Sequence, residues 1–294
     1  MRYLIRILAF AVLPAVCSQV LSAQGLSYGV RAGLNVSSFK GPAEPDNTGK
    51  ELDAYSSITG FHVGASFQYK FTDIFGVRLE LLYSQKGGQY DYNGPSFLRF
   101  TNSALQPVYL TGIRDMKVSV TNSYLELPLT GVVRLGRVEV SGGLVGNILI
   151  SSTGGGTMAF TTQLPNSTQS QTLDLQLEYK FFKDEPGGSP NPGDVVLLSS
   201  GPSSAGVPRT LGAYYEQEQD QGPYFKRFDV NATAGLSFYL NSSLYVGARG
   251  LFGLVDVTNN DADLAYFSLS GGKPSFRTDK DVTYIIQGSV GFSF

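Results

Sequence analysis

Charged side chains recur at alternating positions along otherwise apolar segments, and they are the residues with which this chain could do chemistry. Carboxylates and guanidinium groups could pass protons or ions, or they could pair with one another as a structural network. Five of them are expected on the inner face of one sheet, nearly in register: Arg78, Glu80, Glu126, Glu139 and Arg249. We expect a paired plug, since an unpaired buried charge costs several kcal/mol. A proton or ion path through the same groups is the alternative.

His62 is the only histidine in the sequence, and most acid–base or serine-dependent mechanisms would need it. It could pair with Glu80 on a neighbouring strand. No nucleophile lies at motif spacing, and no zinc, P-loop, GxSxG or dinucleotide motif occurs. The sequence therefore predicts no enzyme, no catalytic residue, no metal site and no cofactor. A net charge of −2 gives no reason to expect a nucleic-acid partner.

The elements that must position these charges are strands. In 124–150, YLELPLTGVVRLGRVEVSGGLVGNILI, apolar and polar residues alternate on both sides of a Leu135-Gly136 turn. Alternation with a period of two predicts strands, and the glycine-containing turn predicts an antiparallel hairpin. Each strand is long enough to cross a bilayer when tilted, which takes about 9–11 residues. The same pattern predicts six more strands, at 27–39, 58–71, 75–86, 225–240, 244–257 and 282–294.

The connections between these strands alternate in length. Strands two and three, four and five, and six and seven are joined by short turns, whereas the other connections are long, including 87–115, which we expect to be irregular. Outer-membrane barrels show this segregation, whereas the Greek-key connections of a soluble sandwich would break it. The prediction is an all-β, eight-stranded antiparallel up-and-down transmembrane β-barrel with long extracellular loops. Ten strands are the alternative, with 157–164 and 171–183 as the added pair.

The two ends of the chain carry export and assembly signals. Residues 1–23 have two arginines, an apolar core and a small-residue cleavage site, which predicts a signal peptide and location in the outer membrane. The barrel domain is then 24–294, with 153–224 a long extracellular loop or hairpin. The last strand ends in outward Phe292 and Phe294, a predicted assembly signal. Aromatic residues at strand ends are expected to anchor the barrel in the membrane interfaces: Tyr28, Phe39, Phe71, Phe75, Tyr83, Tyr239 and Phe292.

Several segments together resemble the PorT-like small outer-membrane β-barrel family of the Bacteroidota. The most specific are ELLYSQKG, within 80–87, and YLELPL, 124–129; YGVRAGLNVSSF, 28–39, and the C-terminal GFSF also match. The resemblance covers nearly every expected strand and implies an eight-stranded barrel. It implies little chemistry, because the family is defined by its barrel, although its founding member is linked to protein secretion. The region 151–222 is unusually long for the family.

Two function classes follow. The first is a structural or accessory barrel that binds a partner through its surface loops, either a surface protein or a secretion complex. The second is a small channel, which would need a wider and emptier lumen than paired long side chains allow. We favour the first. In either case the expected partners include outer-membrane lipid and the barrel-assembly machinery.

Overall fold

The computed structural model describes residues 25–163, 169–200 and 203–294. The predicted signal segment 1–23 therefore lies outside the described residues. All regular elements in the described part are strands, and it contains no helix long and apolar enough to cross a membrane.

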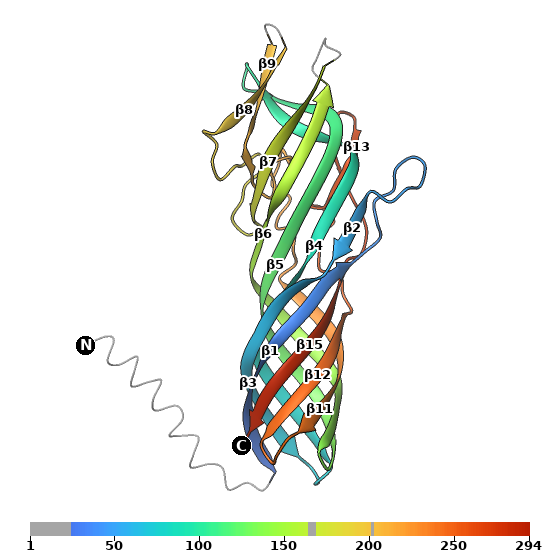
Figure 1. Ribbon diagram of the computed structural model, residues 1–294, viewed down its shortest axis with the longest axis vertical. Coiled ribbons are helices and arrows are strands. Elements are labelled where there is room, and N and C mark those ends of the chain that lie inside the picture. Colours follow the sequence, from blue (N-terminus) through green and yellow to red (C-terminus); the bar gives the residue numbers. More distant parts are fainter. Residues whose placement is uncertain (1–24, 164–168, 201–202) are drawn as a thin grey trace, which may run out of the picture.

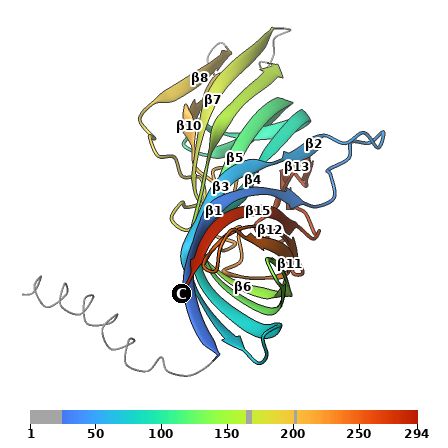
Figure 2. The same cartoon turned by 60° about the horizontal axis from the view of Figure 1, so that its bottom comes forward.

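Eight strands pair in a closed antiparallel ring, which confirms the predicted fold class (Figures 1 and 2). They are β1 (Leu26–Lys40), β3 (Ile58–Lys70), β4 (Phe75–Asn102), β5 (Pro107–Leu135), β6 (Val138–Gln163), β11 (Phe228–Tyr239), β12 (Leu244–Gly253) and β15 (Val282–Ser293). Each pairs with its neighbours in chain order, and β1 closes the ring by pairing with β15 from Gly29↔Ser293 to Lys40↔Val282.

The alternation seen in the sequence becomes the two faces of the ring. On β15, Tyr284, Ile286 and Val290 are exposed, whereas Gln287 and Ser289 between them are buried. The other ring strands repeat this arrangement, so the outer face is apolar and the inner face polar. An apolar outer belt of this extent suits lipid rather than water.

Short turns close the ring at one end. β5 and β6 meet at Gly136, whose φ of 63° lies in the left-handed region that favours glycine. In the β11–β12 turn, Oδ1 of Asn241 accepts hydrogen bonds from the backbone N–H groups of Ser243 and Leu244. This asparagine replaces the missing backbone partners of a tight turn.

Three strands run far beyond the ring and correct the prediction for 87–115. β4 and β5 stay paired from Gly87↔Thr121 to Thr101↔Pro107, so this segment is regular rather than irregular. β6 likewise continues past Ser151 and pairs with β5 as far as Thr162↔Gly112. Figure 1 shows these strands rising above the ring. We call this part the head: residues 41–57, 87–121, 152–227 and 254–281, as far as they are described.

Shorter strands complete the head. β7 (Ser170–Lys180) pairs with β10 (Thr210–Leu211) and with the part of β6 that extends beyond the ring, from Thr153 to Gln163. The others are β2 (Asp53–Ser56), β8 (Val195–Ser200), β9 (Ser203–Pro208) and the separate hairpin of β13 (Leu264–Ser270) and β14 (Lys273–Phe276). The residues that we considered as an added pair of ring strands therefore extend the sheet beyond the ring.

The main hydrophobic core lies in the head, where side chains from β4, β5, β6 and β7 pack together, among them Phe100, Met116, Phe160 and Leu175. Two of the expected interface aromatics belong to the interior instead. Phe39 and Tyr239 are buried inside the ring ends, whereas Tyr28, Phe71 and Phe75 are exposed as expected. Alternation places Phe39 and Tyr239 on the inner face, which the prediction overlooked.

Candidate functional site

Glu80 is the centre of a buried ion-pair cluster in the barrel lumen. Its Oε1 lies 2.9 Å from Nη1 of Arg31 on β1, and its Oε2 lies 2.6 Å from Nη1 of Arg249 on β12. Arg249 Nε also donates to Gln287 Oε1 at 2.6 Å. The carboxylate thus joins three strands across the lumen. Of the five predicted network residues, the structure brings Glu80 and Arg249 together directly.

A second cluster lies nearer the short turns. Arg78 Nη2 lies 2.7 Å from Glu139 Oε2 and donates at the same distance to Gln68 Oε1. Tyr239 donates to the same Glu139 oxygen at 3.2 Å. This cluster joins the second predicted pair, Arg78 and Glu139, across β4 and β6.

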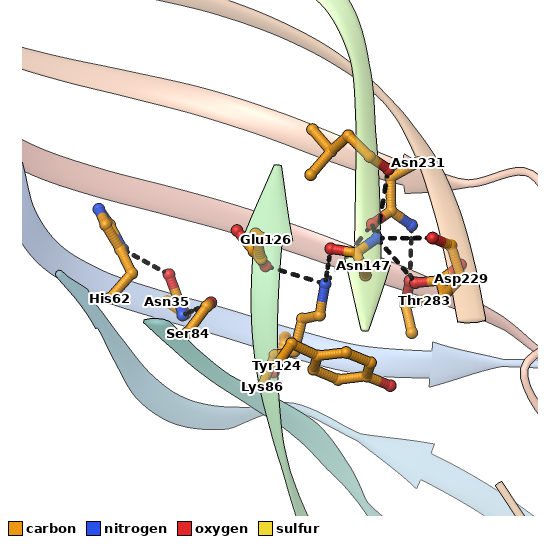
Figure 3. A network of polar contacts seen from close by, with 12 residues as sticks. Asn35, His62, Ser84, Lys86, Tyr124, Glu126, Asn147, Asp229, Asn231 and Thr283 are labelled. Atoms are coloured by element: carbon orange, nitrogen blue, oxygen red, sulfur yellow. Dashed lines mark hydrogen bonds and ion pairs between the residues drawn. The ribbon is translucent and has the colours of Figure 1, made fainter. Parts of the chain in front are cut away.

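The fifth predicted residue, Glu126, has a partner that the prediction left out of the network. Lys86 Nζ lies 2.9 Å from Glu126 Oε1 and donates to Asn147 Oδ1 at 3.0 Å (Figure 3). Asn147 in turn donates to Asn231 Oδ1 at 2.7 Å. Lys86 is two residues after the inward-facing Ser84, so the alternation along the strand already places the lysine side chain in the lumen. The predicted strand ends at this lysine, and the predicted charge network does not include it.

The buried charges of the ring balance. Among its described residues, four cations (Arg31, Arg78, Lys86, Arg249) stand with four anions (Glu80, Glu126, Glu139, Asp229) in the buried interior. Other charges that we placed inward sit at the strand ends: Lys70, Arg137 and Arg227 are exposed and Arg134 is partly exposed. An eight-stranded barrel has an interior just wide enough to be filled by side chains, and these eight charged side chains occupy it with no net charge in total.

His62 does not pair with Glu80, contrary to the prediction. Its Nε2 lies 2.9 Å from Ser289 Oγ and its Nδ1 lies 2.7 Å from Asn35 Oδ1. Gly33 explains why His62 reaches Ser289, because this glycine pairs with His62 on β3 and with Ser289 on β15. A Cβ at Gly33 would lie 2.8 Å from the His62 ring, so the glycine lets the imidazole cross β1.

Serine, histidine and asparagine in this order form the relay that activates a hydroxyl nucleophile in some hydrolases. Here Arg31 Nη2 also donates to Ser289 Oγ at 2.5 Å, which directs the hydroxyl hydrogen toward His62. All three relay side chains are nevertheless buried, with Asn35 and His62 almost fully so. The ion pairs of Glu80 and Glu126 stand in the same lumen, so a substrate has no open approach. The relay fits a structural role.

The predicted assembly signal lies at the edge where the ring closes. Phe292 is exposed on the outer face of β15, and Phe294 is exposed just after the strand ends. The Phe294 ring stacks on Tyr28 of β1, with centroids 5.1 Å apart. The backbone N–H of Phe294 donates to the Tyr28 carbonyl at 2.7 Å.

The head contains a cavity that sequence reasoning missed. It encloses about 90 Å³, and its aromatic lining includes Phe39, Tyr55, Tyr90, Tyr224 and Tyr266. A cavity of roughly 150 Å³ holds a benzene ring, so this one suits a smaller group, such as the end of one side chain. The lining comes from β1, β2, β4 and segments much later in the chain. Only the fold brings these tyrosines together.

One wall of the cavity is acidic. Asp263 and Asp281 line it together with Arg277, whose Nη1 lies 2.9 Å from Asp53. Burial raises the pKa of the Asp263 carboxyl to about 8, and the adjacent acids Asp281 and Asp279 add to the rise that Arg277 opposes. Burial also raises the pKa of Asp281 to about 6. Acidic groups are thus crowded at this wall beside one guanidinium, and without a further cation the crowding favours the protonated form of Asp263.

Comparisons with known proteins bear on the barrel alone. Among curated proteins, none matches this sequence. Among solved structures, Ail of Yersinia pestis in complex with the heparin analogue sucrose octasulfate is 13% identical, with a TM-score of 0.32, covering 92% of this chain and 100% of that one. OprG from Pseudomonas aeruginosa is also 13% identical, with a TM-score of 0.32 and coverage of 92% and 96%. The outer membrane protease OmpT from Escherichia coli is 6% identical, with a TM-score of 0.32 and coverage of 93% and 97%.

A family model decides the assignment. The model described as "Outer membrane protein beta-barrel domain" matches residues 18–259, which is most of the chain. Its match spans seven of the ring's eight strands, from β1 to β12, together with the head apart from the β13–β14 hairpin and its flanks. The chain therefore belongs to the outer membrane protein beta-barrel domain family.

Proposed function

We propose that this protein is a non-enzymatic, non-conducting outer-membrane barrel that carries its head on the cell surface and binds a protein partner there. The ring inserts in outer-membrane lipid with the help of the barrel-assembly machinery, and the head supplies the function. Within the wider family we assign the chain to the PorT-like branch on the segments 80–87 and 124–129, and a secretion-related complex is the partner that this branch suggests.

The filled lumen is the observation that supports a barrel that does not conduct ions. Paired charges from different strands meet at Glu80, Glu126 and Glu139, so an ion crossing the ring would have to break several buried pairs. A channel lined by the same strands would need these side chains to swing aside. The relay of Ser289, His62 and Asn35 supports a non-enzymatic role, because its hydroxyl is enclosed.

The head supports the binding part. It has its own hydrophobic core and a cavity of about 90 Å³, which are more than a loop needs merely to connect strands. In outer-membrane barrels the short turns face the periplasm and the long connections face outward. The head extends from the end of the ring opposite the short turns, so this rule places it outside the cell.

Conductance measurements on the purified protein in planar bilayers test the closed lumen. We expect no steady conductance from the wild type. A variant with Arg31, Glu80 and Arg249 all replaced by serine should show steps if it folds as judged by heat-modifiable migration. Large, stable steps from the wild type would instead establish the small channel as the better reading.

Surface labelling tests the orientation. The only cysteine of the chain, Cys17, lies in the predicted signal, so single cysteines can be introduced into the mature protein. Asn191→Cys lies at an exposed position of the head, and Ser242→Cys lies in an exposed short turn. An impermeant maleimide should label the first on intact cells and the second only after lysis. A cross-linker attached at Asn191 should then capture the partner, whereas one at Ser242 should not.

A further inference from the structure

Three aspartates meet at the acidic wall of the head cavity. Carboxylate oxygens of Asp263, Asp279 and Asp281 all lie within 4.8 Å of one another. Asp263 directly precedes β13, and the other two lie between β14 and β15. The cluster therefore joins the base of the β13–β14 hairpin to the start of a ring strand.

Asp263 is the member that points to a ligand. It is only 6% exposed, yet no hydrogen bond or ion pair of its carboxylate occurs among the described residues. Asp281, by contrast, accepts a hydrogen bond from Thr258 at 3.0 Å and a longer one from Tyr55 at 3.4 Å. The Oδ1 atom of Asp279 is also buried without a hydrogen-bond donor. Buried carboxylate oxygens without donors are costly unless something positive meets them.

The protein supplies too little positive charge for this cluster. Arg277 is the cation that touches it: Nη2 lies 2.7 Å from Asp279, while Nη1 is engaged with Asp53. Glu44 adds a further buried carboxylate to the same region, and its oxygens accept from the backbone N–H groups of Tyr266 and Phe267. One guanidinium therefore stands among five carboxyl groups: Glu44, Asp53, Asp263, Asp279 and Asp281.

The donor set fits a hard divalent cation. Calcium binds oxygen ligands at about 2.3–2.6 Å, so two of its ligands lie at most about 5 Å apart. The spacing of the three aspartates satisfies that limit. The cluster contains no histidine or cysteine, which disfavours zinc and other softer metals. We propose that Asp263, Asp279 and Asp281 bind a calcium ion that fastens the β13–β14 hairpin to the base of the head.

The site does not depend on the proposed partner-binding function, since it rests on the cluster alone. Calcium sites of extracellular modules bind with dissociation constants of roughly 10⁻⁴–10⁻³ M, so a surface site of this affinity would be loaded from the medium. The ion would supply a counter-charge and would link Asp263 to Asp279 and Asp281 across the base of the β13–β14 hairpin.

Terbium luminescence is a direct probe, because terbium binds calcium sites and takes excitation energy from nearby tyrosine. Tyr55 contacts Asp281, and the sequence has no tryptophan to compete. With the full mature protein in detergent, we expect tyrosine-sensitised terbium emission that calcium displaces. We also expect calcium at roughly 0.1–10 mM to raise the melting temperature by several degrees and EGTA to reverse the shift.

Two substitutions separate the site from general acidity of the surface. Asp263→Asn should abolish the sensitised emission and the calcium-dependent melting shift. Asp261→Asn, an exposed neighbour outside the cluster, should keep both. Equal emission from wild type and Asp263→Asn would overturn the site. If Asp263→Asn does not fold, the wild type alone decides the test. A melting temperature that is the same in calcium and in EGTA would refute the proposal. Stabilisation by methylammonium, an organic cation, without stabilisation by calcium would also refute it.

Discussion

Glu80 and Arg249 meet inside the barrel at 2.6 Å although 169 positions separate them in the chain. They lie on β4 and β12, on different sides of the ring, so the contact crosses the lumen. Arg31 on β1 binds the other oxygen of the same carboxylate. This one carboxylate is therefore the shared ion-pair partner of two buried guanidinium groups.

Replacing Glu80 with glutamine should destabilise the barrel by about 3–5 kcal/mol, because two buried arginines lose their counter-charge. Urea unfolding followed by tyrosine fluorescence would measure the change. Asp73→Asn, in an exposed short turn, is the matched control and should change little. Replacing Arg31, Glu80 and Arg249 together with Met, Leu and Met should recover most of the loss. An unaltered midpoint for Glu80→Gln would show that the lumen is wetter than the structure implies.

Ser289 should not react with a fluorophosphonate in the folded protein, since its hydroxyl is buried with His62 and Arg31. Ser289→Ala should instead lower stability by about 1–2 kcal/mol, because two buried donors or acceptors lose a partner. Intact-mass analysis after probe treatment measures the first effect and urea unfolding the second. Labelling that disappears in His62→Ala would mean that the relay is catalytic.

The sequence predicts the ring well because lipid and lumen impose strict alternation on every spanning strand. The predicted limits of 27–39, 58–71 and 244–257 lie close to β1, β3 and β12. Alternation also placed Arg78, Glu80, Glu126, Glu139 and Arg249 on the inner face. Which of them pair depends on the register between strands, which alternation does not give, so Lys86 on the adjacent strand is not predicted as the partner of Glu126.

Alternation predicts the strands of the head less well. These strands face a protein core on one side and water on the other, and both of their faces carry aromatic and polar residues. Gly87, Gly88 and Pro95 also looked like breakers. Pro95 is tolerated because β4 has no second strand partner between Tyr92 and Thr101, so no ladder bond is lost on that side. The cavity could not be predicted, since its residues come from segments far apart in the chain. The three aspartates lie close in sequence, but only the β13–β14 hairpin brings Asp263 back to Asp279 and Asp281.

The closing strand should be sensitive to charge. Replacing Phe292 and Phe294 with aspartate should prevent assembly, because both face outward and Phe294 stacks on Tyr28 where the ring closes. Charged lipid-facing residues cost about 2–4 kcal/mol at mid-bilayer and less near the rim. Heat-modifiable migration of membrane fractions measures assembly. Leucine at both positions is the control and should assemble, and normal assembly of the aspartate variant would show that the strand end carries no signal.

Removing residues 154–222 of the head should leave a ring that still inserts. The lower part of β6, from Val138 to Ile148, keeps its pairs with β5 and β11 when 154–222 is excised and the ends are joined by a short Gly/Ser turn. The ion pairs of Glu80 and Glu139 also stay, because all their partners lie in the ring. We therefore expect a heat-modifiable barrel that resists protease in detergent.

The excision alone would uncover core side chains such as Met116 and Val118 on the remaining upper hairpin, so aggregation of that variant would be ambiguous. A second variant also removes 90–118 and connects Gln89 to Ser119, which face each other in the ladder, through Asn-Gly. That dipeptide suits the tight turn of a two-residue hairpin loop. If the shorter chain inserts and resists protease, the ring folds and inserts independently of these parts of the head. If neither variant inserts, ring and head fold together, and binding at the head can no longer be treated apart from the barrel.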